Sequence, residues 1–534
     1  MHMNKSLSYQ QTGYFSPLIL DYLAQKPYLQ NLYQYFPTLE NFKKQIELKQ
    51  NSYLESTRNR LVKSLNNQYQ NTAISPKTKN NLELLTKENT FTITTGHQLN
   101  LFTGPLYFFY KIISVINLTE QLNNAYAEYN FVPVYWMATE DHDFDEINFF
   151  NFKQQKLEWK VNASGPVGEL KTEQLDEVFK QFESLLNQST NAKKLKELFI
   201  NSYFNQENLA EATQYLVNEL FGEYGLVIVD SNKKELKKEF IPFIKSDIFQ
   251  NTAYKKVSKT KSYLEKSDYK VQVNPREINF FYQDKNLRER IIFQKNSFYV
   301  NNTDLVFSPK EIEDEIDKNP QKFSPNVILR PLYQETILPN LAYIGGGGEI
   351  AYWLELKSFF DAEKTPFPIL FLRNSALLVL SKQFEKLEKL EVSIEDLFLK
   401  TNELKTVYTE KVSQLDIDFS KQKQFLEQQF QDLYQLAKKT DQSFLGAVAA
   451  QEKKQKNGLD HLEKRLLKAQ KRKFESEINR VLKLQEELFP NQNLQERVLN
   501  FSEFYEAFGD QLIEKLKENL NPLNFKFSII QLDN

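Results

Sequence analysis

The sequence contains no cysteine among its 534 residues. A chain without thiols cannot form disulfide bonds, a zinc site with thiolate ligands or an iron–sulfur cluster, and it cannot use a cysteine nucleophile. Any catalysis must therefore use oxygen, nitrogen or backbone groups.

An excess of charge and a long apolar run are also lacking. The 68 Lys and Arg residues balance 70 Asp and Glu residues, so a net charge of −2 gives no overall field that would hold nucleic acid or an anionic membrane. No stretch approaches the roughly 20 apolar residues of a membrane span, and the N-terminal region lacks the apolar centre of a signal peptide. We expect a cytoplasmic protein that binds neither nucleic acid nor a membrane.

Glycine is scarce, with 14 residues, whereas hydrophobic residues make up 41% of the chain. This composition is typical of a folded protein, and the length exceeds that of a single core, so we expect two or three domains. Because glycine is rare here, the places where it clusters are informative.

One β-α-β unit is predicted near the start of the chain. Phe91–Thr95 is rich in β-branched residues and ends at Gly96, and Phe131–Trp136 is a second strand. Between them, a mostly apolar helix over Leu106–Leu122 is expected, with Pro105 as its first residue and Thr103 or Gly104 as its cap. Ligands of such units bind at the carboxyl ends of the parallel strands.

Further strands are predicted along the chain. Gly225–Asp230 and Pro368–Arg373 are short buried runs that suit the same sheet. A small β insertion is expected around Tyr269–Val273, Asn279–Tyr282 and Arg290–Phe293. The pattern indicates an α/β core that is interrupted and then resumed.

After Ser375 the composition changes to Leu, Lys, Glu and Gln in helical order. Apolar residues recur at spacings of three and four in two arms, with Lys473 as a break, which predicts a long antiparallel helical hairpin or coiled coil. These residues are Phe419, Leu426, Phe430, Leu433 and Ala437 in the first arm and Leu459, Leu462, Leu466, Ala469, Ile478, Leu482 and Leu488 in the second. We expect a homodimer formed through this hairpin.

The sequence therefore divides into six predicted segments. They are a helical lead-in (1–85), the first part of the core with an insertion (86–230), a connecting insertion with a small β element (231–322), the second part of the core (323–375), the α-helical coiled coil (376–490) and a C-terminal segment that returns to the core (491–534).

Two of the four histidines, His97 and His142, lie at predicted strand ends, where a ring that titrates near neutrality can act as a donor, acceptor or base. The alternative is an ordinary loop residue that the backbone satisfies. The acids around His142, which are Glu140, Asp141 and Asp143, could bind a hard cation or form a polar loop. We expect no tightly bound metal.

Two glycine-containing segments could approach a ligand. The Gly96–Gly104 loop precedes a helix and could hold a phosphate, although an ordinary turn is the alternative. The run Gly345–Gly348 precedes Glu349 and could admit a ligand or act as a hinge. Arg330 and Gln334, on a predicted short helix, could pair with a carboxylate or phosphate.

The motifs resemble those of the bacillithiol biosynthesis cysteine-adding enzyme family, the cysteine ligases. The matching stretches are Thr94–Gln98 (TTGHQ), Leu101–Tyr107 (LFTGPLY), Thr139–Asp143 (TEDHD), Asn326–Pro331 (NVILRP), Gln334–Glu335 and Gly348–Trp353 (GEIAYW), followed by Leu462–Leu467, Lys471–Lys473, Leu488–Pro490 and Leu494–Arg497. They cover nearly the whole chain in order. The family usually has Gln at the position of His97 and an Ala-Gly-Pro-Gly type sequence at the tetraglycine.

The resemblance implies a Rossmann-like nucleotide-binding core with connecting insertions, a coiled-coil domain used for dimerisation, and the last step of bacillithiol synthesis. In that step L-cysteine is joined to the amine of glucosaminyl-malate, and we expect ATP to activate the cysteine carboxylate. A non-catalytic, nucleotide-binding coiled-coil interaction protein is the alternative.

The site residues expected for the ligase fall into three groups. Catalytic roles are assigned to His97, Asp141, His142 and Asp143; ATP binding to Thr95, Gly96, Gln98, Thr103, Gly104 and Lys111; and substrate binding to Tyr107, Glu140, Arg330, Gln334, Gly348, Glu349 and Tyr352.

Overall fold

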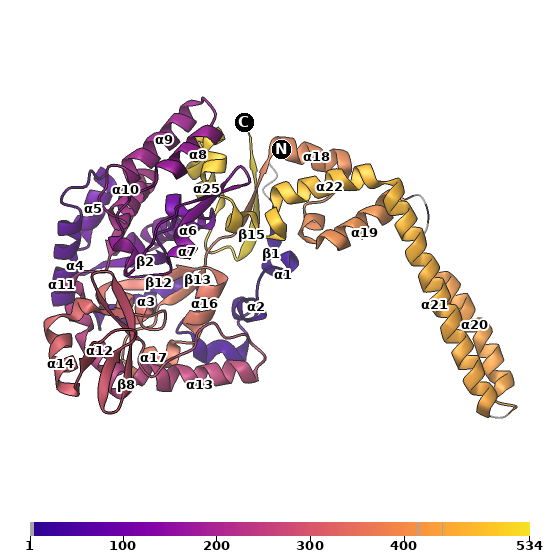
Figure 1. Cartoon of the computed structure of the whole chain (residues 1–534), viewed down its shortest axis with the longest axis horizontal. Coiled ribbons are helices and arrows are strands. Elements are labelled where there is room, and N and C mark those ends of the chain that lie inside the picture. The colour runs from indigo at the N-terminus through magenta and orange to yellow at the C-terminus, as the bar shows by residue number, and fades with distance from the viewer. Residues whose placement is uncertain (1–4, 414, 416, 441, 534) are drawn as a thin grey trace. The chain divides into compact units, whose positions relative to one another are not determined.

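The computed structural model describes residues 5–413, 415, 417–440 and 442–533. The chain forms two compact units. The first contains the residues up to Leu377 together with Glu496–Ile530, and the second contains Leu378–Gln495 together with Gln531–Asp533. Figure 1 labels many of the helices and strands of both.

A five-stranded parallel sheet forms the centre of the first unit. Its strands are β2 (Thr90–His97), β3 (Asn130–Met137), β6 (Val227–Asp230), β12 (Asn340–Gly345) and β13 (Ile369–Leu372), in the spatial order β13-β12-β2-β3-β6. Numbered along the chain, this is the order 5-4-1-2-3 of a doubly wound sheet, in which the order reverses between β2 and β12. The predicted α/β, Rossmann-like core is confirmed.

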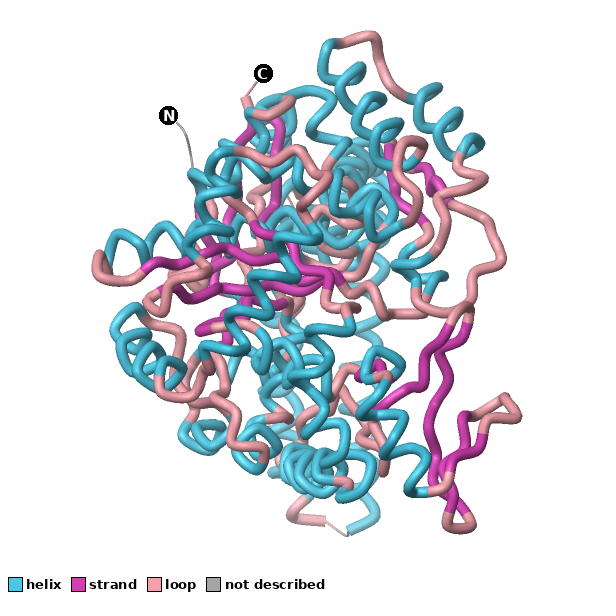
Figure 2. Tube along the Cα trace, turned by 90° about the vertical axis from the view of Figure 1, so that its left-hand side faces the viewer, coloured by secondary structure: helices cyan, strands magenta, loops and turns pink. Residues whose placement is uncertain are grey.

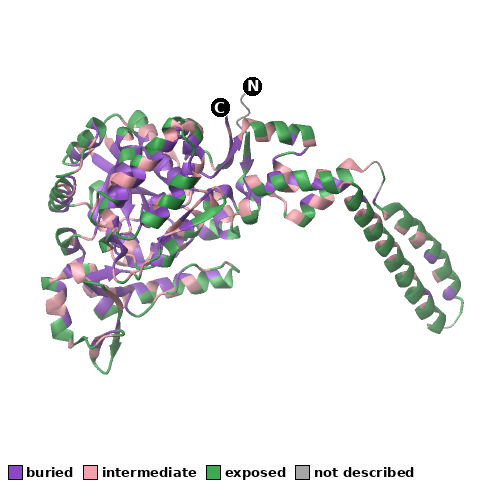
Figure 3. Ribbon diagram, turned by 45° about the horizontal axis from the view of Figure 1, so that its top comes forward, coloured by how far each residue is buried: buried purple, intermediate pink, exposed green. Residues whose placement is uncertain are grey.

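The sheet is buried on both faces, including the four threonines of β2. All eight residues of β2 and all four of β6 and β13 are buried. Figure 3 shows buried strands (purple) inside this part of the chain. Helices α6 (Tyr107–Ala125) and α3 (Leu39–Gln50) pack against it through a shared apolar cluster that includes Phe42, Phe91 and Val115. In Figure 2 the strands (magenta) run between layers of helix (cyan).

The N-terminal segment is helical, as predicted, but it begins with an unpredicted strand, β1 (Lys5–Ser8). This strand pairs antiparallel with β15 (Lys526–Leu532), so a strand near the C-terminus joins the first unit. The four polar-rich residues of β1 show no recognisable strand pattern, since their ladder partner is more than 500 positions away. The helices that follow are α1 (Tyr9–Thr12), α2 (Pro17–Leu23), α3, α4 (Glu55–Gln68) and α5 (Pro76–Leu84).

Between β3 and β6 the chain adds a two-stranded ribbon and a helical layer. These elements are α7 (Phe144–Ile147), β4 (Phe149–Phe152), β5 (Gln155–Glu158), α8 (Asp176–Leu185), α9 (Thr190–Tyr203) and α10 (Leu209–Phe221). The C-terminal helices of the first unit are α23 (Gln495–Val498), α24 (Ser502–Phe508) and α25 (Gln511–Asn519). The ring of Phe102 packs among aromatic rings of both groups, including Phe150 and Phe501 at about 5 Å.

The predicted β insertion is a five-stranded antiparallel sheet in the order β10-β9-β8-β7-β11. Its strands are β7 (Phe280–Asp284), β8 (Leu287–Gln294), β9 (Ser297–Val300), β10 (Val306–Phe307) and β11 (Phe323–Pro325), and its helices are α11 (Lys234–Lys237), α12 (Ile241–Gln250), α13 (Thr252–Lys266) and α14 (Pro309–Lys318). The strand predicted at Tyr269–Val273 is wrong. There the N–H of Gln272 donates to the Glu355 carboxylate at 2.7 Å, so a side chain replaces the strand partner.

The return to the core provides α15 (Leu329–Ile337), α16 (Gly347–Leu354) and α17 (Lys357–Ala362). The short helix predicted to hold Arg330 and Gln334 is α15, so this prediction is confirmed.

The second unit begins within β14 (Ala376–Leu380) and is helical after that strand. Its helices are α18 (Ser381–Leu390), α19 (Thr401–Val412), α20 (Ser420–Ala437), α21 (Gln442–Lys473) and α22 (Glu475–Leu488). The hairpin of α20 and α21 confirms the predicted antiparallel arms up to Lys473, whereas Ile478, Leu482 and Leu488 of the predicted second arm lie in the separate helix α22. Phe430 and Ala437 pack with Val448 inside the hairpin, whereas Leu433 and Leu462 are exposed and lie outside its core. Within the described residues, no helix is long and apolar enough to cross a membrane.

Candidate active site

A cleft of about 950 Å³ lies at the carboxyl ends of β2, β3 and β12, where the strand order reverses. Doubly wound sheets bind ligands at this position, because adjacent loops there diverge to opposite sides of the sheet. Twelve of the predicted residues line the cleft: Gly96, His97, Gln98, Tyr107, Lys111, Glu140, Asp141, His142, Asp143, Arg330, Glu349 and Tyr352. Thr95, Thr103, Gly104, Gln334 and Gly348 do not line it.

The loop after β2 differs from the predicted phosphate loop. Helix α6 begins at Tyr107 with Leu106 as its N-cap, so Pro105 is not its first residue and neither Thr103 nor Gly104 caps it. The Leu106 N–H instead donates to the carbonyl of Leu499 at 2.7 Å. The second half of the loop is buried in the core around Phe102, and only its start, Gly96 to Gln98, reaches the cleft.

Thr95 is buried for a structural reason: its hydroxyl donates to the Ile344 carbonyl of β12 at 2.7 Å. Gly104 has φ +62° and lies against Asn100, where a Cβ atom would come within 2.7 Å of the Asn100 Cβ. These two residues therefore hold the backbone around the cleft and do not face it.

Buried Lys111 and partly exposed Glu349 form an ion pair with 2.6 Å between Nζ and Oε2. Lys111 also donates to the Gly96 carbonyl at 2.5 Å, and Glu349 accepts from the Tyr343 hydroxyl at 2.6 Å and the Gly346 N–H at 2.9 Å. Burial alone would raise the pKa of Glu349, but Lys111 holds it below its usual range. The predicted phosphate-binding lysine is thus neutralised within the protein.

Arg330 extends from α15 into the cleft with neutral partners. It donates to the Gln334 side chain at 3.1 Å and to the Tyr352 hydroxyl at 3.4 Å, and its guanidinium lies 5.6 Å from the Tyr343 ring centroid. Among the described residues it has no ion-pair partner within 4 Å. Its charge is therefore available to a carboxylate or phosphate.

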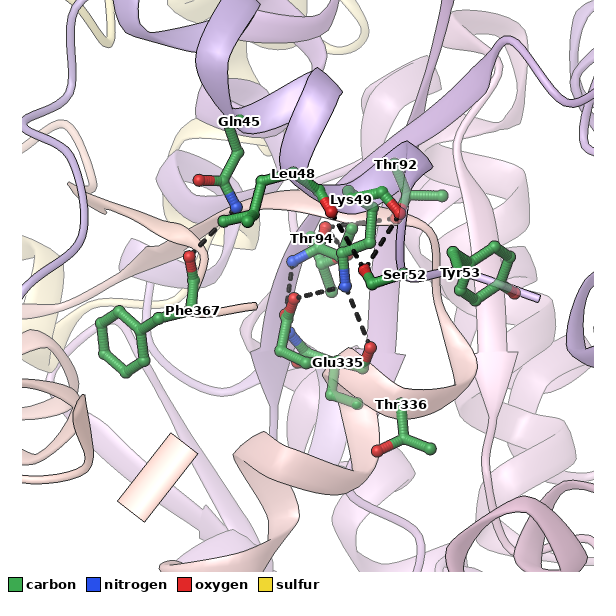
Figure 4. Close-up of polar contacts among 12 residues, drawn as sticks. Gln45, Leu48, Lys49, Ser52, Tyr53, Thr92, Thr94, Glu335, Thr336 and Phe367 are labelled. Carbon is green, nitrogen blue, oxygen red and sulfur yellow. Dashed lines mark hydrogen bonds and ion pairs between the residues drawn. The ribbon is translucent and has the colours of Figure 1, made fainter. Parts of the chain in front are cut away.

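Gln334 does not contact the cleft but holds Arg330 from behind. Its amide nitrogen donates to Glu335 at 2.9 Å, and Glu335 accepts from Lys49 at 3.5 Å and from Asn340 at 2.6 Å. Figure 4 shows the part of this network in which Lys49 of α3 reaches Glu335 of α15. The predicted role of Gln334 in substrate binding is better described as support for Arg330.

The acidic motif after β3, Thr139–Asp143, contains both a buried, paired carboxylate and an exposed one. Glu140 is buried and pairs with Lys237 at 2.5 Å, whereas Asp143 is exposed. Burial alone would raise the pKa of Asp141, but the hydrogen bonds that its carboxylate accepts from the Gln98 side chain and from the backbone N–H of His142 lower it to about 2. Asp141 is therefore an anion at neutral pH and a weak base.

His97 is enclosed at the end of β2. Burial, together with the nearby cations Lys111 and Arg373, lowers the pKa of His97 well below its usual range, so the ring is neutral. Its Nε2 atom is buried and has no hydrogen-bond partner among the described residues. A base must exchange protons with a ligand, and an enclosed Nε2 atom is poorly placed for that.

The four glycines have individual positions at the end of β12. Gly345 ends the strand. A Cβ atom there would come within 2.9 Å of the Tyr343 ring, which explains why a side chain does not fit at this position. Gly346 is the N-cap of α16, and Gly347 and Gly348 form its first turn, where no φ is positive. Gly348 has open space around it, so nothing within the described chain requires a glycine there.

The cleft contains further residues that the sequence did not single out, above all Arg288 and Tyr343. Tyr343 lies in β12, for which no strand was predicted, so it was missed together with that strand. Arg288 comes from β8 of the insertion, and only the tertiary structure brings it to the cleft.

The carboxylates of Asp141 and Asp143 and a ring nitrogen of His142 lie within 4.8 Å of one another, close enough to surround a cation. The guanidinium of Arg288, however, contacts His142 Nδ1 at 2.5 Å and brings a positive charge to the group. This donor set is poorly suited to a cation, and the absence of a bound metal stays a prediction.

Models of the bacillithiol biosynthesis BshC proteins match this chain along nearly its whole length. The model of their N-terminal Rossmann-like domain matches residues 1–374, and the model of their C-terminal coiled-coil domain matches residues 376–532. The chain belongs to the BshC family.

Several BshC relatives support the assignment. A protein of Flavobacterium johnsoniae is 57% identical over 526 residues, covering 98% of this chain and 99% of its own. The relative from Cytophaga hutchinsonii is 39% identical over 525 residues, covering 98% of each chain, and one from Bacillus cereus is 29% identical over 552 residues, covering 99% of each. All three carry the name "Putative cysteine ligase BshC", so the activity named for these relatives is that of a ligase.

Proposed function

We propose that this BshC protein joins L-cysteine to the amine of glucosaminyl-malate, the last step of bacillithiol synthesis, after ATP converts the cysteine carboxylate to an adenylate. The family assignment and the names of the relatives support a cysteine ligase. The cleft supports the reaction class, because it combines a fixed cation with carboxylates and a histidine at the ligand-binding edge of the sheet. The cytoplasmic location stays a prediction.

The observation that carries the proposal is Arg330. A guanidinium that is held by Gln334 and Tyr352 but lacks an anionic partner is suited to bind a carboxylate or phosphate in a defined orientation. Orientation matters because amide formation needs an activated carboxyl carbon and an amine held together, and positioning alone contributes several kcal/mol to such reactions. Both substrates and ATP carry anionic groups that Arg330 could hold.

The test is to incubate the purified protein with L-cysteine, glucosaminyl-malate and ATP and to follow the thiol product and AMP by mass spectrometry. We expect both products, and we expect Arg330→Met to lower product formation by about 100-fold, as for the loss of one charged contact in a transition state. Lys310→Met, which removes an exposed cation of α14, is the matched control.

The outcomes separate the parts of the proposal. Product formed without AMP would refute activation by adenylate but leave the ligase. Absence of product under reducing conditions, with folded protein, would refute the ligase assignment. Equal activity of Arg330→Met and Lys310→Met would refute the role of Arg330.

We also propose that the hairpin of α20 and α21 forms a homodimer. Large apolar side chains of its surface are exposed, among them Phe425 at 65%, Leu436 at 54% and Leu462 at 54%. We expect the pair of changes Phe425→Glu and Leu462→Glu to shift the protein to a monomer in sedimentation velocity. Gln428→Glu, at an exposed position of α20, should leave the dimer intact, and a wild-type monomer would refute the proposal.

A further inference from the structure

Arg288 is held in place beside the acidic motif by contacts to all three of its guanidinium nitrogens. Its Nε donates to the Ser324 hydroxyl at 3.0 Å, Nη2 donates to the Pro325 carbonyl at 3.3 Å, and Nη1 lies 2.5 Å from His142 Nδ1. The guanidinium also lies 4.0 Å from the centroid of the Phe281 ring. Strands β7, β8 and β11 of the insertion therefore position Arg288 on His142.

This contact determines which nitrogen of His142 carries the proton. A guanidinium has only N–H donors and keeps its charge at any ordinary pH, so it cannot accept a hydrogen bond. The partner at 2.5 Å must be the acceptor, which requires Nδ1 of His142 to be unprotonated and leaves the ring proton on Nε2.

Neighbouring acids do not reverse this arrangement. The nearest carboxylate, Asp141, has its Oδ1 atom 3.7 Å from Nδ1, farther away than Arg288, and this oxygen already accepts the His142 N–H at 2.8 Å. The Asp141 Oδ2 atom accepts from Gln98 at 2.9 Å. Glu140 pairs with Lys237, and Asp143 makes no ion pair within the described residues.

We propose that Arg288 is a positioning residue that holds His142 as the neutral Nε2–H tautomer, so that His142 presents a hydrogen-bond donor to the cleft. The His142 side chain is 39% exposed and lines the cleft, and its Nε2 makes no hydrogen bond within the described part of the chain. His142 therefore acts as a donor to a ligand oxygen. It is not the base that the position after β3 suggested.

The consequence for the reaction depends on the proposed ligase function. His142 Nε2–H donates to the acyl oxygen of the activated cysteine, where negative charge develops as the amine nitrogen forms its bond to the acyl carbon. The bond between that carbon and the phosphate oxygen then breaks, and the proton lost by the amine passes to a carboxylate. Asp143, exposed on the same loop and lining the cleft, is the carboxylate assigned to accept it.

The tautomer can be measured without any substrate. Full-length protein labelled with ¹⁵N-histidine contains four histidines, and His142→Gln identifies the signals of His142 in a long-range ¹H–¹⁵N spectrum. At pH 7.5 we expect an unprotonated Nδ1 and a protonated Nε2 in the wild type, and a mixture of tautomers in Arg288→Met. Arg290→Met, two residues along β8, is the matched control and should leave the His142 signals unchanged.

A protonated Nδ1 in the wild type, or unchanged His142 signals in Arg288→Met, would overturn the inference even if the protein is a ligase. The role in the reaction has a separate readout. Because a Gln amide can place an N–H near the position of Nε2, His142→Gln should stay within about 10-fold of the wild-type kcat, whereas His142→Ala should lose 100-fold or more. Equal losses in the two variants would overturn the donor role.

Discussion

The buried ion pair of Lys49 and Glu335 gives a prediction that stability measurements can test in depth. Lys49 of α3 is 1% exposed and Glu335 of α15 is fully buried, with 3.5 Å between Nζ and Oε2, and Lys49 also donates to the Glu335 carbonyl at 3.0 Å (Figure 4). Replacing Lys49 by Met keeps most of the side-chain volume but leaves the carboxylate without its cation. Breaking such a pair costs about 3–5 kcal/mol, because a charge remains buried without compensation.

The pH dependence identifies which charge remains. In Lys49→Met, burial raises the pKa of Glu335 above its value in the unfolded chain, so the folded state binds more protons and stability falls as the pH rises. In Glu335→Gln, burial lowers the pKa of Lys49, so the folded state binds fewer protons and stability rises with pH. The two variants should therefore show opposite slopes between pH 6 and 8.5.

Intrinsic tryptophan fluorescence reports on the first unit alone. The three tryptophans of the chain, Trp136, Trp159 and Trp353, all belong to that unit and are at most 1% exposed. Urea unfolding followed by this signal at pH 6 and 8.5 therefore measures the unit that contains the pair. The exposed Lys310→Met variant is the control and should not shift the midpoint measurably.

The double variant Lys49→Met with Glu335→Gln completes a double-mutant cycle, which measures the interaction between the two side chains. Because it leaves no buried charge, we expect it to be at least about 2 kcal/mol more stable than the sum of the single losses predicts. Additive losses, or slopes of the same sign in both single variants, would refute the reasoning.

Three further predictions concern backbone conformation and a buried acid. Gly104→Ala should lower the free energy of unfolding by about 1–3 kcal/mol, because φ is +62° and the new Cβ would meet Asn100; an unchanged urea midpoint would contradict this. Gly348→Ala should leave it unchanged or raise it by up to about 1 kcal/mol, since Gly348 is helical with open space around it. Loss of product formation in that stable variant would place a substrate against Gly348. Burial raises the pKa of Asp247 to about 7, so ionisation of its carboxyl group opposes folding. The free energy of unfolding of the wild type should therefore fall by up to about 1.4 kcal/mol per pH unit between pH 4 and 7. Asp247→Asn should lack this contribution, and identical thermal midpoint curves for the two proteins would refute it.

Local patterns predicted most core elements because a buried parallel strand or an apolar helix is encoded by adjacent residues. Phe91–Thr95 lies in β2, Phe131–Trp136 in β3 and Pro368–Arg373 around β13. The secondary-structure predictions were wrong where a group distant in the sequence decides the local conformation. The side chain of Glu355 replaces a ladder partner at Gln272, and the carbonyl of Leu499 sets the start of α6 at Leu106.

The candidate site also combines features that adjacent residues encode with features that depend on distant residues. His97 and Asp141 could be found from the sequence because they follow predicted strands, and the carboxyl ends of parallel strands meet at one edge of the sheet. Glu349 could be found because it follows the run of four glycines. Whether a group there is free or paired depends on its neighbours in space. Lys111 was predicted to bind phosphate, but Glu349, 238 positions later, neutralises its charge.

The sequence by itself determined the absence of thiol chemistry, the α/β core and the edge of the sheet where ligands bind, because composition and strand order along the chain are local properties. The tertiary structure decided the state of each group at that edge. Arg288 reaches His142 across 146 positions, and Lys49 reaches Glu335 across 286. Protonation and charge respond to atoms within a few ångströms, and only folding brings those atoms together.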